Sequence, residues 1–319
     1  MDRKIAVIMG SDSDFDTMKE MIPVLKEAGI GYEFRVISAH RTPHIAADFA
    51  QNVKTNGFDL IIAGAGMSAH LPGVLAAFTG APVIGVPIKS ESSGMNGLDA
   101  LLSIIQMPPG IPVAAVGIDN TTGAAKLAVK MCRTAVADNT GKPTVKIMHD
   151  RNATSGADLK KTITTLDVYG ISYILIDLAD FMINETASDH ILPEPEEVLK
   201  RRILSGDKTF AIINLTEINI EKIVENDDRA NLMPIIEVPQ KALSDGLNDT
   251  SDKVYSQTGR SGQAAFVGVN SYQNAAHLAA RIAGIHDTAI YEAVVGEHAK
   301  LAAAVVEKDA KIRALAAIG

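Results

Sequence analysis

The chain has 319 residues, of which 47% are hydrophobic and 21% charged, and its formal net charge is -8. This balance is typical of a globular protein, the length suggests two domains, and the acidic charge argues against a nucleic-acid surface. The one cysteine, Cys132, excludes a disulfide framework and a cysteine-based metal site. The first strand begins close to Met1 and no apolar run is long enough to span a bilayer, so we expect a cytoplasmic protein that binds neither membrane nor nucleic acid.

Strand and helix patterns alternate through residues 1–134. The apolar runs that predict strands lie at 5–9, 32–37, 59–63, 82–86 and 112–116. The periodic runs that predict helices lie at 14–28, 43–53, 69–78, 98–105 and 121–133. This alternation predicts right-handed crossovers and a parallel sheet covered on both faces, an α/β three-layer sandwich of the flavodoxin-like or Rossmann-like type.

A polar linker is expected at 135–143, and residues 144–319 repeat the first region. The matching segments are 58–61 with 210–213, 82–87 with 234–239, 116–118 with 267–269, 124–128 with 275–279, and 29–32 with 170–173. The offset is 152 residues for the first two pairs, 151 for the next two and 141 for the last, which places an insertion between 177 and 207. The order of the matches predicts two tandem copies.

The polar loop residues of the first copy are not repeated. Phe181 or a neighbour stands where the first copy has His40, and Lys222 stands opposite His70. The second copy is therefore predicted to be a degenerate repeat, in which packing is retained without the chemistry.

Four loops of the first copy follow the carboxyl ends of predicted strands, where parallel sheets bind ligands. Loop 10–14 combines glycine, serine and aspartate, which suits a phosphate and a ribose, although a plain helix cap explains it equally. Loop 38–43 carries His40 and Arg41, an acid–base group and an anion-binding fork, or else an ordinary surface pair.

The other two loops are weaker signals. Loop 63–73 has a glycine pair and His70, which alone would more often be a packed helix-start residue. Loop 89–97 is small and polar, either a closing cover or a solvated loop. Two histidines and an arginine without metal-ligand spacing predict a phosphorylated small molecule and proton transfer.

Residues 3 to about 133 resemble the N5-carboxyaminoimidazole ribonucleotide mutase family, the catalytic-subunit family of phosphoribosylaminoimidazole carboxylase. The segments that carry the resemblance are 9–14, 38–43, 63–66, 69–73, 103–108 and 110–113. The resemblance implies an enzyme of purine biosynthesis that converts N5-carboxyaminoimidazole ribonucleotide to 4-carboxy-5-aminoimidazole ribonucleotide by decarboxylation and recarboxylation. It implies no metal and no organic cofactor.

The resemblance also implies roles for individual residues. The implied substrate-binding set is Ser11, Ser13, Asp14, Ser38, Arg41, Gly64 and Ala65. Within it, Ser11, Ser13 and Arg41 would hold the phosphate and Asp14 the ribose. The implied catalytic residues are His40, as general acid–base, and His70, in the loop that lines the base and the migrating carboxylate.

Two alternatives remain open. A related branch carboxylates aminoimidazole ribonucleotide directly with free CO2, but it has Lys at the position of Arg41 and lacks segment 69–73. A nucleotide-binding homologue without catalysis is the other, and the intact His40 argues against it. Pro109 stands where a non-proline residue is more usual in the family.

The resemblance further implies a long carboxy-terminal helix that packs on a neighbouring subunit, and octamers of single-domain members. Only the second copy has a run for this helix, at 288–315. Its apolar positions predict one buried face and are Ile290, Val294, Leu301, Val305, Ile312 and Leu315. We therefore expect a homo-tetramer that mimics an octamer of single domains.

Overall fold

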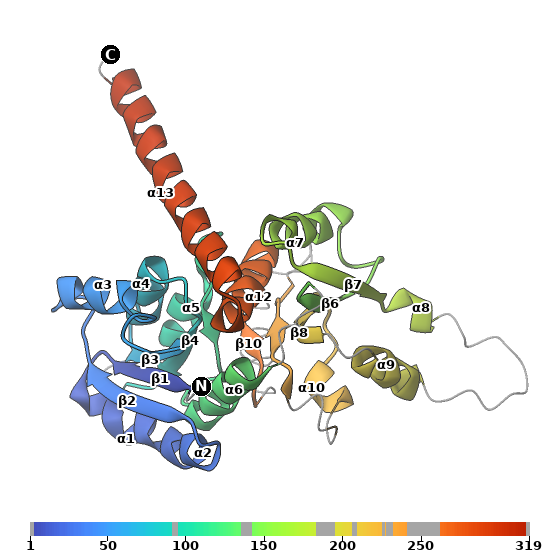
Figure 1. The fold of residues 1–319 in the computed structure, drawn as a ribbon, viewed down its shortest axis with the longest axis horizontal. Helices are drawn as coiled ribbons and strands as arrows, with labels where there is room; N and C mark the ends of the chain where they lie inside the picture. Colours follow the sequence, from blue (N-terminus) through green and yellow to red (C-terminus); the bar gives the residue numbers. More distant parts are fainter. Residues whose placement is uncertain are drawn as a thin grey trace, which may run out of the picture.

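A ten-stranded, mostly parallel sheet passes through both regions of the chain (Figure 1). The computed structural model describes residues 3–90, 95–134, 142–182, 195–205, 209–224, 227, 232–240 and 262–316. The strands are β1 (Lys4–Met9), β2 (Gly31–Val36), β3 (Leu60–Gly66), β4 (Val83–Ile88), β5 (Ala114–Ala115), β6 (Thr144–His149), β7 (Ser172–Asp177), β8 (Thr209–Asn214), β9 (Ile235–Glu237) and β10 (Ala265–Phe266). Their order is β2-β1-β3-β4-β5-β10-β9-β8-β6-β7, and among these neighbours β5 and β10 pair antiparallel.

Helices cover both faces of this sheet. They are α1 (Phe15–Met18), α2 (Ile22–Glu27), α3 (Pro43–Gln51), α4 (Leu71–Phe78), α5 (Leu98–Ile105), α6 (Thr121–Arg133), α7 (Gly156–Val168), α8 (Ala179–Met182), α9 (Pro195–Leu204), α10 (Ile220–Ile223), α12 (Tyr272–His286) and α13 (Thr288–Ala316). One apolar cluster joins the sheet to α1, α2, α6, α7 and α12, and the other joins it to α3, α4, α5, α9 and α10. Successive residues of a strand enter opposite clusters, as Val7 and Ile8 do. The predicted α/β three-layer sandwich is confirmed.

Three predicted elements need correction. The helix expected at 14–28 is divided by a 3-10 turn at Lys19–Met21, because Pro23 has no backbone N–H to donate to the preceding turn. The strand expected at 112–116 pairs only at Ala114–Ala115. The strands β2 and β7 lie at the two edges of the sheet and are partly exposed, so the sheet is covered on both faces only in its interior.

The two regions have the same internal strand order. In the first it is β2-β1-β3-β4-β5, and in the second β7-β6-β8-β9-β10. A left-handed turn recurs as well: Asp119 and Asn270 have φ of 55° and 54°, and their amides donate to the carbonyls of Pro87 at 2.8 Å and Pro239 at 2.9 Å. This matching geometry supports a duplication. Residues 135–141 of the predicted linker and 183–194 of the predicted insertion lie outside the described residues.

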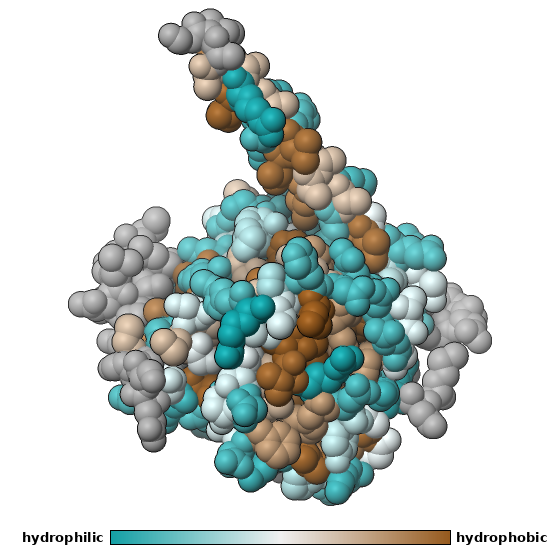
Figure 2. Space-filling view, turned by 90° about the vertical axis from the view of Figure 1, so that its left-hand side faces the viewer, coloured by the Kyte–Doolittle hydropathy of each residue, from teal (hydrophilic) through white to brown (hydrophobic). Residues whose placement is uncertain are grey.

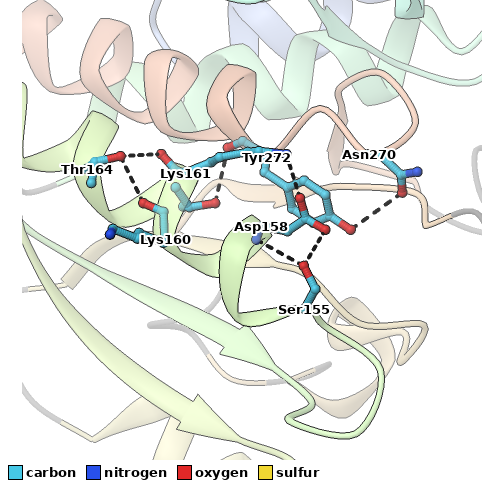
Figure 3. Close-up of polar contacts among 8 residues, drawn as sticks. Ser155, Asp158, Lys160, Lys161, Thr164, Asn270 and Tyr272 are labelled. Atoms are coloured by element: carbon cyan, nitrogen blue, oxygen red, sulfur yellow. Dashed lines mark hydrogen bonds and ion pairs between the residues drawn. The ribbon is translucent and has the colours of Figure 1, made fainter.

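In the second region, polar groups at the start of α7 form hydrogen bonds with residues of the same region (Figure 3). The hydroxyl of Ser155 accepts a hydrogen bond from the amide of Asp158 at 3.1 Å and donates to the Asp158 carboxylate at 2.7 Å. On the neighbouring turn, the hydroxyl of Thr162 donates to the Tyr272 carbonyl of α12 at 3.2 Å. The start of α7 is therefore capped by its own side chains and packed against α12.

The helix α13 begins in the body of the molecule and projects far beyond it (Figure 1). Ile290 and Val294 are buried and Leu301 is half-buried, but every residue from 302 to 316 is exposed. In the single chain only the inner half of the predicted face is buried, so burial of Val305, Ile312 and Leu315 would require another subunit. Among the described residues, no helix has the length and apolarity needed to cross a membrane.

Acid is expected to destabilise the fold through His277 on α12. Its Nδ1 lies 2.7 Å from the Tyr169 hydroxyl, and burial lowers the pKa of His277 to about 4 from an ordinary 6.5. The folded state binds a proton at His277 less readily than the unfolded state does. The contribution of His277 to stability is therefore fully present above pH 6.5 and is lost as the pH falls towards 4, at a cost on the order of 3 kcal/mol. Chemical denaturation between pH 7 and 4 should show a shallower loss for His277→Gln than for the parent chain, and equal pH dependence would contradict the assignment.

Candidate active site

A hollow of about 760 Å³ opens where the carboxyl ends of β1, β2, β3 and β4 meet one edge of the sheet. The predicted site residues that line it are Ser11, Ser13, Asp14, Ser38, His40, Arg41, Ala65 and His70. They come from three loops that are far apart in the sequence and adjacent in the sheet. The topology therefore brings together eight of the nine residues, with Gly64 as the exception.

The loop after β1 presents hydroxyl groups to the hollow. The Ser11 hydroxyl accepts hydrogen bonds from the Ser13 amide at 3.3 Å and the Ser13 hydroxyl at 2.9 Å. Ser11 is in extended conformation and caps the 3-10 turn Asp12–Asp14. Two hydroxyls and nearby amides at the start of a helical segment form a suitable surface for a phosphate.

Asp14 occupies the inner side of the same loop. Burial raises the pKa of its carboxyl above the ordinary value, and hydrogen bonds involving Ser11 and Ser13 oppose part of that rise. A half-buried carboxyl beside hydroxyl donors can accept hydrogen bonds from a polyol such as ribose.

A tight turn after β2 holds His40 and Arg41 in place. The Thr42 hydroxyl accepts from the Ser38 amide at 3.0 Å and donates to the Ser38 carbonyl at 2.9 Å, while the Ser38 hydroxyl accepts from the Arg41 amide at 3.1 Å. Pro43 then begins α3 with a fixed φ. The Arg41 guanidinium reaches back to the Gly10 carbonyl at 3.3 Å, which places a cation beside the serine loop.

The two histidines of the site contact each other directly. His40 Nε2 and His70 Nδ1 are 3.0 Å apart, and the rings meet edge-on with centroids separated by 5.1 Å. His70 directly precedes the first residue of α4, so the orientation of this helix sets the position of its ring. Because one nitrogen must donate and the other accept, the pair links an acid–base group to a fixed partner.

Gly64 lies behind the hollow rather than on its wall. Its carbonyl accepts a hydrogen bond from the Gly10 amide at 3.3 Å. A Cβ at this position would lie 2.5 Å from Met18 Sδ and 2.9 Å from Ile88 Cδ1. The glycine is thus required for packing between β3 and its neighbours.

Thr17, Met67 and Lys89 also line the hollow and are among the residues that sequence reasoning did not assign individually. Thr17 follows Ser13 by four residues, a helical spacing that signals a shared face. Met67 has a φ of 54°, which the sequence does not reveal. Lys89 is held by Asp119, whose carboxylate accepts from the Lys89 amide at 2.9 Å, whereas residues 91–94 of the predicted cover lie outside the described residues.

Polar groups at the matching edge of the second region satisfy one another. Arg151 pairs with Asp177 at 2.6 Å and also with Asp180. The Asn214 amide donates to the Glu237 carboxyl at 2.6 Å, and burial raises the pKa of Glu237 to about 8. Phe181 of α8, near the position that matches His40, packs against the apolar cluster. Among the described residues of this edge, no contact between two histidines is present.

The first region is closely similar to known proteins. The AIR carboxylase family matches residues 4–153. The N5-carboxyaminoimidazole ribonucleotide mutase of Pyrococcus abyssi is 59% identical over 128 residues, which are 40% of this chain and 72% of that protein. The phosphoribosylaminoimidazole carboxylase of Saccharomyces cerevisiae is 51% identical over 127 residues, 40% of this chain and 22% of that protein.

A solved structure from Treponema denticola, PurE2-S38D, is 30% identical to this chain with a TM-score of 0.35. The match covers 40% of this chain and 78% of the T. denticola chain. The P. abyssi match extends over most of that protein, and the family match at residues 4–153 includes the three loops that carry the predicted site residues. On this evidence the chain belongs to the AIR carboxylase family.

Proposed function

We propose that the chain converts N5-carboxyaminoimidazole ribonucleotide to 4-carboxy-5-aminoimidazole ribonucleotide. The observation that carries the proposal is the contact between His40 and His70, 3.0 Å apart in a hollow that also holds Arg41 and two serine hydroxyls. The names of the relatives from Pyrococcus abyssi and Thermotoga maritima support the same reaction, at 59% and 51% identity.

The substrate phosphate is proposed to bind between Ser11, Ser13 and Arg41, where hydroxyls, turn amides and a guanidinium face one space. Asp14 would then accept hydrogen bonds from the ribose. This placement directs the base towards Ala65 and the histidine pair, because they line the same hollow.

His40 is proposed to act as both acid and base. The carbamate C–N bond breaks with release of CO2, and His40 protonates the departing nitrogen. C4 of the ring then attacks the retained CO2 to form the new C–C bond, and His40 removes the C4 proton. The CO2 must not escape, so Lys89 and Ser90, which line the hollow, would help to exclude water during the reaction.

Direct carboxylation with free CO2 is the second candidate. Arg41 and segment 69–73 with His70 favour the mutase, since the direct branch has Lys at the former position and lacks the latter. Purified protein incubated with N5-carboxyaminoimidazole ribonucleotide, without added bicarbonate, should form the C4-carboxylated product. Turnover only of aminoimidazole ribonucleotide with bicarbonate would instead identify the direct carboxylase, and turnover of neither would favour a non-catalytic binding protein.

Arg41→Lys is expected to weaken substrate affinity by about tenfold, because lysine keeps the charge but loses the two-pronged contact with phosphate. Dependence on free bicarbonate should rise in the same variant. Steady-state kinetics at low substrate concentration measure both effects. Arg35→Lys, on the exposed part of β2 and outside the hollow, is the matched control; an unchanged KM in Arg41→Lys would remove this residue from the phosphate site.

The second region is proposed to be a degenerate copy of the first. We take residues 1–134 as the catalytic domain, 135–143 as the linker, and 144–319 as the repeat with its carboxy-terminal helix. The matching strand orders and the paired turns at Asp119 and Asn270 support this division. The polar residues at the edge of the second region are engaged with one another, which suits a role in packing.

Four chains are proposed to assemble through α13, so that eight domains are present. Along this helix the residues 294, 298, 301, 305, 308, 312 and 315 alternate in steps of four and three, the spacing of one continuous helical face. The inner part of that face already packs within the chain, and its outer part carries exposed Val305, Ile312 and Leu315. Hydrophobic residues are visible on the surface of the projecting helix (Figure 2). A second copy of the chain is the proposed partner, since the exposed face continues an interface that the chain itself forms.

A further inference from the structure

Arg281 is a buried cation that connects the second region to the candidate site of the first. It lies on α12 and is 1% exposed. Its guanidinium donates to the carbonyl of Ala76 at 3.1 Å, in the last turn of α4, and to the carbonyl of Ala81 at 3.4 Å. Carbonyls at a helix end lack partners within the helix and carry the negative end of its dipole, so a forked cation holds them well.

The guanidinium is also held from the far side, by α13. His298 Nε2 lies 2.5 Å from Arg281 Nη2, and the His298 ring hydrogen-bonds the backbone of Gly110. Burial lowers the pKa of His298 to about 4, so at neutral pH its ring can accept from the guanidinium. Among the described residues, the partners of Arg281 are therefore carbonyl groups and a neutral histidine.

A second residue of α12 holds the loop that covers α4. The amide of Asn274 accepts from the Gly110 nitrogen at 2.8 Å and donates to the carbonyls of Met107 and Pro108, each at 3.1 Å. The sulfur of Met107 in turn lies 3.0 Å from where a Cβ on Gly73 of α4 would be. The second region thus contacts α4 at its carboxyl end and, through this loop, along its side.

The residue of the first region that matches Arg281 in sequence makes a different contact. At the offset of 151 residues, Arg281 matches Lys130 of α6, which is also buried. Lys130 interacts with Glu221 on α10. In the repeated pattern, α10 of the second region corresponds to the start of α4 in the first. The cation that faces the intact site is a fork able to hold two carbonyls, whereas the cation that faces the degenerate half is a single ammonium.

We propose that Arg281 is a positioning residue for the candidate active site. By fixing the carboxyl end of α4, it sets the place of His70 at the other end and hence the contact between His70 and His40. The expected effect on the reaction rate rests on the proposed function. The expected effect on the contact between His70 and His40 rests on the geometry alone. It gives the second region a direct part in the reaction without any catalytic residue of its own.

The kinetic test compares Arg281→Lys with the matched control Lys130→Met. Arg281→Lys keeps the charge and loses the fork, and a misplacement of His70 should lower kcat by about 100-fold with little change in KM. Lys130→Met removes the buried cation at the matching position of α6 and should leave kcat near that of the parent chain. Equal losses of kcat in the two variants would show a general structural effect and overturn the proposal.

A double-mutant cycle tests whether the effect passes through His70. If Arg281 acts by placing His70, Arg281→Lys should cost almost nothing further in a His70→Asn background. The same fold loss in both backgrounds would overturn the proposal. Should Arg281→Lys unfold at the assay temperature, His298→Asn removes one partner of the guanidinium, and a smaller loss that also disappears in the His70→Asn background is expected.

An activity-independent measurement separates this inference from the proposed function. Long-range ¹H–¹⁵N spectra of the histidine rings, assigned with His40→Asn and His70→Asn, report the contact between Nε2 and Nδ1. Arg281→Lys should shift the signals of both rings, and Lys130→Met should not. Unshifted signals would refute the positioning role, whereas absence of turnover by the parent chain with shifted signals would refute only the proposed reaction.

Discussion

Replacement of His40 by asparagine is expected to abolish turnover while substrate binding stays within about an order of magnitude. The general acid–base group contributes typically ~10²–10⁴-fold to a rate, and its loss acts on the chemical step. Asparagine is too short to reach the position of Nε2, so the contact with His70 is lost, whereas the phosphate contacts from Ser11, Ser13 and Arg41 are untouched.

Single-turnover kinetics and equilibrium binding of the substrate measure the two effects separately. The control is His44→Asn, the same change at an exposed histidine of α3 that does not line the hollow, and its rate should equal that of the parent chain. Near-normal turnover in His40→Asn would remove His40 from the mechanism. A loss of binding in proportion to the loss of rate would assign it to substrate binding instead.

Most of the strands could be predicted because a parallel strand buried on both faces is a continuous apolar run. Residues 5–9 are an example, and they form β1 at Lys4–Met9 with five buried residues. The helix at 14–28 was predicted less well, since apolar spacing says nothing about backbone donors and Pro23 removes one. The ends of the short β5 could not be predicted from the sequence, because the apolar run continues on both sides of Ala114–Ala115.

The candidate site followed from topology more than from any one residue. Strand ends at one edge of a parallel sheet bring their loops together, which is why Ser11, His40 and Ala65 share a hollow. The 3.0 Å contact between His40 and His70 was not predictable, because a separation of 30 residues carries no information on side-chain direction. The family resemblance assigned Gly64 to the substrate-binding set, but only the positions of Met18 and Ile88 reveal that it is a packing residue.

The sequence also did not predict that the two regions form a single sheet. The antiparallel pairing of Phe266 with Ala115 joins the strands of the two regions at an edge that the sequence does not identify. That pairing places α12 beside the first region and makes the contacts of Arg281 possible. The repeated segments therefore predict two similar regions but do not predict the interface between them.

Charged substitutions on the outer face of α13 are expected to dissociate the assembly. The exposed fractions of Val305, Ile312 and Leu315 are 64%, 64% and 68%, although each is a large apolar side chain. Burying such a side chain contributes roughly 1.5–3 kcal/mol, and burying an unpaired carboxylate opposes association by at least as much. Val305→Glu combined with Ile312→Glu should therefore convert a particle of four 33.8 kDa chains, about 135 kDa, into single chains.

Light scattering at micromolar concentration measures this change directly. The control is Val168→Glu, which places the same charge at an exposed valine that ends α7, far along the chain from α13, and it should leave the mass unchanged. Val305 and Ile312 lie outside the hollow, so a fall in activity on dissociation would show that the assembly supports the site. A parent chain that scatters as 33.8 kDa with full activity would contradict the assembly, and it would make the outer half of α13 a surface for some other partner.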